Sequence, residues 1–109
     1  MSTLTTHVLD TTLGKPAQGI PVVLEHAGAV VGSGTTDADG RVPGLVPAGG
    51  TLAAGSYRLR FAVEGYLRKA GYRSFYTDVV VQFVIDAGQD HYHLPLLLSP
   101  FGYTTYRGS

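Results

Sequence analysis

The sequence predicts a mainly β fold, an antiparallel β-sandwich with one short α-helix, in a single domain spanning residues 1–109. Segments in which apolar and polar residues alternate recur along the chain, enough for about seven or eight short strands separated by turns. Residues 64–71 instead combine good helix formers with a terminal glycine, which predicts the helix. A chain of 109 residues buries roughly two-thirds of its unfolded surface, enough for a modest core.

The first half of the chain supplies several of the expected strands. Residues 4–10 and 20–26 alternate between apolar and polar side chains, and residues 29–35 form a weaker strand of small residues. Residues 11–19 are expected to turn. Asp37-Ala38-Asp39-Gly40 is a second turn, because Asp accepts hydrogen bonds from its own backbone and Gly adopts positive φ.

The second half ends in a strand with two different faces. The further expected elements are a very short strand at 41–42, a loop over 43–55, strands over 57–63, 78–85 and 91–98, and a last strand after a turn at 99–102. In the strand over 91–98, the core face carries Tyr92, Leu94, Leu96 and Leu98. The opposite face carries His91, His93, Pro95 and Leu97. Two imidazoles on one face are not needed for structure alone.

Composition excludes several classes of partner and site. The chain has 8 Lys+Arg against 8 Asp+Glu, so charge gives no reason to expect binding to nucleic acid or to an anionic membrane. It has no cysteine, which excludes disulfides, thiolate metal sites and cysteine nucleophiles. We expect no signal peptide and no membrane span, because the N-terminal residues lack a basic and an apolar region and no apolar run is long enough.

His7 and His93 are the candidate acid–base residues. Each lies on the face of its strand that points away from the expected core, so the two imidazoles share one outer surface if these strands are neighbours. A histidine has a pKa near ~6.5 and can act as a base at neutral pH. Arg41 follows the Asp-Gly turn, and this position alone predicts a solvent-exposed charged side chain in a loop. We expect the other candidates to be surface residues: His26, His91, Arg58 and Arg60.

The known motifs for metals and phosphates are not matched. Residues 37–40 resemble the start of a calcium loop, but the third acidic ligand and the glutamate at the twelfth position are missing. Two histidines without a further ligand at close spacing make a weak zinc site. The sequence also lacks a Gly-x-Ser-x-Gly elbow, a phosphate loop and a dinucleotide fingerprint.

Three stretches of the sequence resemble one known family. They are the opening residues 4–17, the middle residues 36–41 and the closing residues 96–109. The chain is similar over essentially its full length to the 5-hydroxyisourate hydrolases, the transthyretin-related enzymes of urate breakdown. The terminal Tyr106-Arg107-Gly108-Ser109 is a specific signature, since it separates these enzymes from the hormone carrier transthyretin.

The resemblance implies a fold and an assembly. The fold would be a transthyretin-like sandwich of two four-stranded sheets with one short α-helix. The protein would be a homotetramer, a dimer of dimers, with its active sites at the dimer–dimer interface. The first strand and the last two would then lie in the sheet that lines a central channel.

The resemblance also implies a reaction and its residues. The six-membered ring of 5-hydroxyisourate would be opened at a cyclic amide to give 2-oxo-4-hydroxy-4-carboxy-5-ureidoimidazoline, without a metal or an organic cofactor. His7 and His93 would perform acid–base chemistry, and which of them is the base stays open. Arg41 and Arg107 would hold the ring and stabilise the oxyanion. The remaining implied site residues are Tyr106, which would cover the substrate, Gly108, which would contact it, and Ser109, which would orient a histidine or the water.

Two other classes of function share the predicted fold. A transthyretin-like carrier of a small aromatic ligand is the first, although a tyrosine at the channel mouth and the charged His/Arg set argue against it. A structural sandwich module is the second, and it would need no outward-facing pair of histidines. The terminal Arg-Gly-Ser is not a peroxisomal signal, so the cytoplasm is the expected location.

Overall fold

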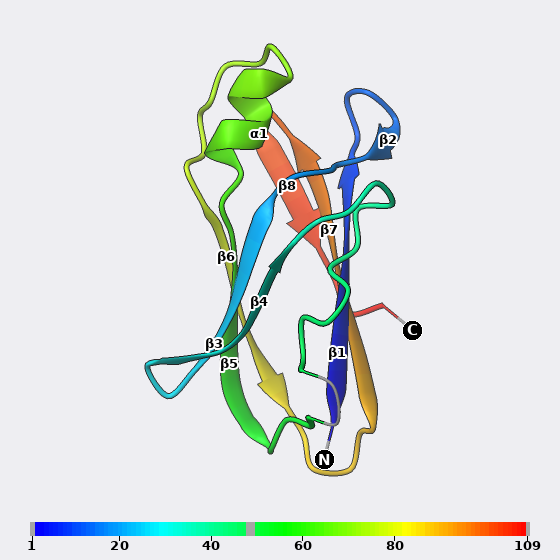
Figure 1. The fold of residues 1–109 in the computed structure, drawn as a ribbon, viewed down its shortest axis with the longest axis vertical. Helices are drawn as coiled ribbons and strands as arrows, with labels where there is room; N and C mark the ends of the chain where they lie inside the picture. Colours follow the sequence, from blue (N-terminus) through cyan, green and yellow to red (C-terminus); the bar gives the residue numbers. More distant parts are fainter. Residues whose placement is uncertain (1, 48–49, 109) are drawn as a thin grey trace.

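Two β-sheets and one helix make up the structure, a computed structural model that describes residues 2–47 and 50–108. The elements are β1 (Thr3–Asp10), β2 (Lys15–Pro16), β3 (Pro21–His26), β4 (Ala29–Thr35), β5 (Gly55–Phe61), α1 (Glu64–Lys69), β6 (Val79–Ile85), β7 (His91–Ser99) and β8 (Gly102–Thr105). One sheet has the order β2-β1-β7-β8 and the other β4-β3-β5-β6, so the prediction of two four-stranded sheets with one short helix is confirmed (Figure 1).

The core lies between the two sheets and follows the alternation in the sequence. On β1, β5 and β7 every second residue is buried, as expected from a period of two, apart from the first residue of β5. The fully buried side chains of the first sheet include Val8, Leu96 and Leu98, and those of the second include Val22, Leu24, Leu59 and Phe61. On β6 only the end residues Val79 and Ile85 are fully buried, because this strand lies at the edge of its sheet.

The central pair of the first sheet differs from the expected antiparallel arrangement. β1 and β7 run parallel, with Thr3 opposite His91 and Asp10 opposite Leu98, whereas all other strand pairs are antiparallel. Hairpin-connected strands must be antiparallel, but β1 and β7 are separated by the whole second sheet, so no short turn constrains their direction. The short strand β2 was also missed, because its two residues lie inside an expected turn region.

Helix α1 forms where predicted and ends two residues earlier than the predicted segment. Gly71 adopts a positive φ of 88° just beyond it. The Tyr72 N–H donates to the Leu67 carbonyl and the Gly71 N–H to the Arg68 carbonyl, the two bonds of a Schellman cap. Gly71 therefore ends the helix, as expected. Within the described residues, no helix is both long and apolar enough to span a membrane.

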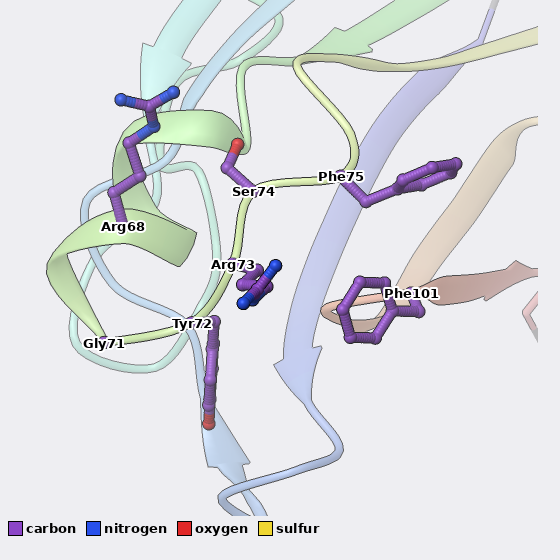
Figure 2. Close-up of a pocket in the computed structure, with 7 residues that line it drawn as sticks. All are labelled: Arg68, Gly71, Tyr72, Arg73, Ser74, Phe75 and Phe101. Atoms are coloured by element: carbon purple, nitrogen blue, oxygen red, sulfur yellow. The ribbon is translucent and has the colours of Figure 1, made fainter.

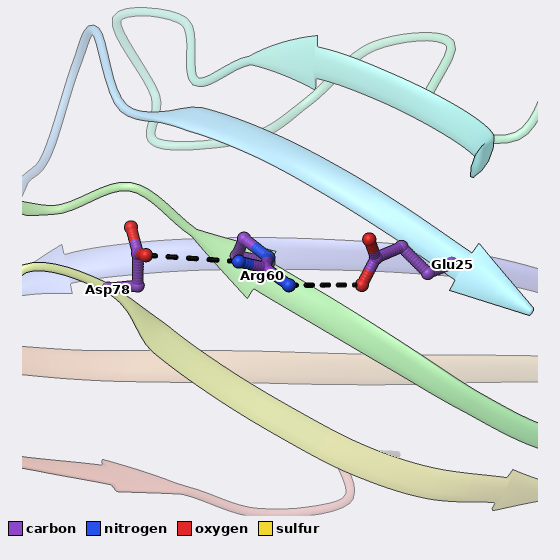
Figure 3. A network of polar contacts seen from close by, with 3 residues as sticks. All are labelled: Glu25, Arg60 and Asp78. Atoms are coloured by element: carbon purple, nitrogen blue, oxygen red, sulfur yellow. Dashed lines mark hydrogen bonds and ion pairs between the residues drawn. The ribbon is translucent and has the colours of Figure 1, made fainter. Parts of the chain in front are cut away.

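The outer face of the second sheet carries an ion-pair network. Arg60 on β5 lies 3.5 Å from a Glu25 carboxylate oxygen on β3 and 3.9 Å from one of Asp78 (Figure 3). All three side chains are partly exposed, so each pair contributes at most about 1 kcal/mol. This confirms Arg60 as a solvent-facing charge with a structural role.

Candidate active site

The parallel register of β1 and β7 brings the two candidate histidines together. Thr5 lies opposite His93 and His7 lies opposite Pro95, so His7 and His93 occupy neighbouring rows of one sheet. Both side chains are half-buried and alternate with buried core residues, which places them on the outer face. The prediction that their strands are neighbours and that both imidazoles share one surface is confirmed.

The Asp37–Gly40 turn places Arg41 beside His7. Arg41 forms an isolated antiparallel bridge with His7, and the Val8 N–H donates to the Gly40 carbonyl at 2.8 Å. The Asp37 carboxylate accepts from the Arg41 N–H at 3.0 Å and so closes the turn. Gly40 has a φ of 78°, and a Cβ there would lie 2.3 Å from the Val8 carbonyl oxygen. The turn thus places Arg41 beside His7. The residue pattern alone had indicated only a solvated loop charge, whereas the family resemblance had included Arg41 in the site.

The C-terminal segment reaches the same surface. Gly108 bridges His93, with its N–H donating to the His93 carbonyl at 2.8 Å. This bridge continues the register of the β7–β8 pair, in which Leu96 lies opposite Thr105. Tyr106 follows β8 and is 54% exposed. Ser109 lies outside the described residues.

Arg107 does not join the cluster. Its guanidinium carbon lies 5.1 Å from the centroid of the Tyr92 ring. Tyr92 is buried on the face of β7 opposite to His93, so this cation–π contact holds Arg107 on the core side of the strand. The structure thus brings together His7, Arg41, His93 and Gly108, and it turns the Arg107 guanidinium toward Tyr92.

The surroundings of His93 keep its ring neutral. Burial, followed by the positive charges of Arg41, His7 and His91, lowers the pKa of His93 below its usual value. A hydrogen bond of 2.8 Å joins its Nδ1 to the Thr5 hydroxyl. A histidine with a lowered pKa stays an unprotonated base at neutral pH, as general base catalysis requires.

Sequence reasoning missed Thr5 and treated His91 as an ordinary surface residue. His91 is exposed, as expected, but its Nε2 lies 3.2 Å from the Thr5 hydroxyl, which also contacts His93. The sequence does contain two threonines and two histidines at alternate positions of β1 and β7. Their contact could not be predicted without knowing the register of the two strands.

Two hollows adjoin the outer face and its edge. A space of about 510 Å³ is lined by Thr3, Thr5, Asp37 and Arg41 together with the loop after Arg41. A smaller space of about 260 Å³ contacts His93, Tyr106 and Arg107 and opens toward β6. The larger space therefore adjoins Arg41, and the smaller one adjoins His93. Among the described residues, no three His, Asp or Glu side chains are grouped closely enough to hold a metal ion.

A further hollow lies away from these residues. Figure 2 shows it between α1 and the β7–β8 turn, where Phe101 points toward Arg73 and Phe75 lies near Phe101. Its volume is about 640 Å³, but none of the candidate site residues lines it. It offers no acid–base pair and is not the candidate site.

Comparison with known proteins identifies the family. Residues 4–108 match the profile described as the HIUase/Transthyretin family. The chain belongs to this family. The 5-hydroxyisourate hydrolase 2 of Rhizobium meliloti is 45% identical over 114 residues, which cover 97% of this chain and 95% of the relative.

Solved structures of the HIUase/Transthyretin family share the whole fold. The 5-hydroxyisourate hydrolase of Klebsiella pneumoniae superposes with a TM-score of 0.89 at 41% identity and covers 100% of both chains. Sea bream transthyretin in complex with thyroxine gives a TM-score of 0.84 at 31% identity, covering 96% of this chain and 93% of that one. The transthyretin-like fold is confirmed, while the roles of individual site residues stay predictions.

Proposed function

We propose that this chain is a 5-hydroxyisourate hydrolase that acts in urate degradation. The observation that carries the proposal is the meeting of His7, Arg41 and His93 on one sheet face, from three separate segments of the chain. The hydrolases of Rhizobium meliloti and Klebsiella pneumoniae, which match nearly the full chain at 45% and 41% identity, support the same activity.

The reaction needs a base, a proton donor and a positive charge. Hydrolysis of the cyclic amide begins when a water loses a proton and attacks the carbonyl carbon. We assign the base to His93, because its lowered pKa leaves it neutral. General acid–base catalysis of this kind contributes roughly 10²–10⁴-fold. His7, in the next row, is then placed to return a proton to the leaving nitrogen.

Arg41 supplies the positive charge. When water attacks, the carbonyl oxygen becomes an anion, and a positioned donor there is worth roughly 10²-fold or more in rate. Two hydrogen bonds hold Arg41 beside His7: the Val8 N–H donates to the Gly40 carbonyl, and the Arg41 N–H donates to the Asp37 carboxylate. A guanidinium in a fixed position can bind the electron-rich ring and then stabilise the oxyanion.

The C-terminal residues complete the proposed site. Tyr106 would cover the substrate, Gly108 would contact it next to His93, and Ser109 would orient a histidine or the water. For Arg107 to bind the ring on this face, its guanidinium must first leave Tyr92. That contact is worth roughly 0.5–1 kcal/mol at an exposed site, so substrate binding can displace it.

The chain is proposed to assemble with three further copies of itself into a homotetramer, a dimer of dimers with active sites at the dimer–dimer interface. Two observations support assembly. The edge strands β6 and β8 lie on one side of the sandwich, where both contribute to the same hollow. Val80 and Val84 on β6 are exposed apolar side chains on a strand edge that can pair with a second copy. A cytoplasmic location stays a prediction.

The test is a direct assay. Freshly generated 5-hydroxyisourate should lose its ultraviolet absorbance much faster with the protein than without it, and equally fast after treatment with a chelator. A rate equal to the spontaneous one would rule out the hydrolase. Similarity to sea bream transthyretin makes a thyroxine carrier the second candidate. Saturable thyroxine binding by a chain without hydrolase activity would favour that carrier.

A further inference from the structure

Four side chains form a hydrogen-bonded row on the outer face of the first sheet. The Thr3 hydroxyl lies 2.7 Å from His91 Nδ1, and the Thr5 hydroxyl lies 3.2 Å from His91 Nε2 and 2.8 Å from His93 Nδ1. The parallel register produces the row, because it sets Thr3 opposite His91 and Thr5 opposite His93. We call these four residues the Thr–His ladder.

We propose that Thr3, His91 and Thr5 position the ring of His93 and carry protons between it and solvent. This inference rests on the proposed hydrolase function, in which His93 is the base. Thr5 occupies Nδ1, so Nε2 is the ring nitrogen left for the reacting water. Thr3, Thr5 and His91 are exposed and His93 is half-buried, so Thr3 and His91 form the end of the ladder away from the His93 ring.

The ladder can be hydrogen-bonded in two opposite directions. A hydroxyl has one proton to donate, and a neutral imidazole has one donor and one acceptor nitrogen. In the first direction, His93 Nδ1–H donates to Thr5, the Thr5 hydroxyl donates to His91 Nε2, and His91 Nδ1–H donates to Thr3. His93 Nε2 is then bare and can accept a proton. In the second direction every donor and acceptor is exchanged, and His93 Nε2 carries a proton that it can donate.

Switching between the two directions balances the protons of the reaction. When His93 Nε2 takes a proton from water, its Nδ1 proton passes to Thr5, and the Thr5 proton passes to His91 Nε2. The His91 Nδ1 proton then passes to Thr3, which releases one to solvent. Each group gains one proton and loses one, so His93 ends neutral with Nε2–H. Loss of the Nε2 proton to solvent, with uptake of one proton at Thr3, reverses the sequence and restores the first direction. His7 meanwhile gives its proton to the leaving nitrogen and regains one from solvent.

The charges around His93 favour such a neutral pathway. Arg41, His7 and His91 all act on its ring, and each is a basic group. Arg107, the basic residue of the C-terminal segment, lies over Tyr92 on the opposite face of β7. A lasting positive charge on His93 is therefore disfavoured by its neighbours. The ladder removes the charge by passing a proton away from the cluster.

The first test replaces the central hydroxyl. Thr5→Val keeps the size and the strand preference of the side chain but removes both hydrogen bonds, so kcat should fall at least about ten-fold with little change in KM. Thr5→Ser restores the hydroxyl and should recover most of kcat. The matched control is Thr6→Val, since Thr6 lies on the core face of β1 and its hydroxyl donates to the Leu94 carbonyl. Wild-type kcat in Thr5→Val would overturn the proposal.

The second test separates proton transfer from positioning. His91→Gln keeps a side chain that can hydrogen bond to Thr5, but an amide does not exchange protons as an imidazole does. The variant should lose kcat by a factor comparable to that of Thr5→Val. Full kcat in His91→Gln would overturn the proton pathway.

A spectroscopic readout keeps this inference distinct from the proposed function. Nitrogen-15 NMR of the histidine rings should show that Thr5→Val changes the His93 Nδ1 shift and that Thr6→Val does not. Unchanged His93 shifts in Thr5→Val would overturn the ladder whether or not the protein is active. A wild-type protein that fails to hydrolyse 5-hydroxyisourate would instead overturn the proposed function.

Discussion

At the scale of single residues, the charges around His93 decide when it can act as a base. Burial lowers its pKa most, and the Arg41 charge is the next cause. Because the pKa is lowered, the ring stays neutral at pH values where an ordinary histidine, with a pKa near ~6.5, is partly protonated. The acidic limb of the activity profile should therefore lie below that of an ordinary histidine.

Removing the Arg41 charge tests this dependence. In Arg41→Gln the pKa of His93 should rise toward its usual value, without reaching it, because burial remains the larger cause. Arg41→Lys keeps the charge and should leave the pKa close to that of the wild type. Proton NMR titration of the His93 ring measures both variants. Equal His93 pKa values in the wild type and in Arg41→Gln would contradict the assigned role of the charge.

Gly108 presents a second test at this scale. A Cβ at this position would lie 2.8 Å from His93 Cδ2 and 3.3 Å from the His93 carbonyl oxygen, so Gly108→Ala must displace the ring or the terminal segment. Activity on 5-hydroxyisourate should fall about ten-fold or more, because acid–base catalysis depends on placement within hydrogen-bond reach. The midpoint of chemical unfolding should change little. A stable variant with full activity would show that the segment does not need this close approach.

At the scale of elements, a buried carboxylate joins α1 to the first sheet. Asp10 is 2% exposed at the end of β1. One carboxylate oxygen accepts from the Thr12 and Leu13 N–H groups, and the other accepts from the Tyr66 hydroxyl at 2.7 Å. Burial, followed by the bond to Asp10, raises the pKa of Tyr66, so its hydroxyl stays a donor.

Substituting the helix tyrosine measures this link. Tyr66→Phe leaves the buried carboxylate short of one donor, so the free energy of unfolding should fall by about 1.5–3 kcal/mol. Tyr76→Phe is the control, because the Tyr76 hydroxyl donates to the Phe101 carbonyl at 3.3 Å in an exposed position and does not contact Asp10. Urea denaturation of both variants should show a lower free energy of unfolding for Tyr66→Phe alone. Equal losses would mean that the bond to Asp10 contributes little.

The strands also show which features of the site can be predicted from local sequence patterns and which cannot. Alternation located the faces of β1 and β7 and therefore the outward positions of His7 and His93, because a side chain's face depends only on its own strand. The parallel pairing of these strands, and with it the Thr–His ladder, depends on a contact between residues 88 positions apart. The contact of Arg107 with Tyr92 is likewise nonlocal. Arg41 and the terminal residues were predicted as site residues from the resemblance to a family, because no periodic pattern indicates their positions.

At the scale of the whole molecule, the free edges of the sandwich determine how copies can assemble. Both β4 and β6 are edge strands of the second sheet. Val30 on β4 and Val84 on β6 are equally exposed, at 61% each. Only the β6 edge lies beside β8, an edge strand of the sheet that carries the candidate site. Pairing along the β6 side would therefore extend both sheets at once. An unpaired apolar edge of this kind favours association with a second copy.

The two valines allow a matched test of the proposed tetramer. In sedimentation equilibrium the wild type should behave as four copies, and Val84→Lys should shift it to smaller species, because charges brought together across a paired edge repel each other. Val30→Lys places the same charge on the opposite edge and should leave the tetramer intact. Activity should fall together with the tetramer in Val84→Lys, since the proposed active sites lie between dimers. A monomeric wild type would rule out this assembly, and dissociation by Val30→Lys alone would move the interface to β4.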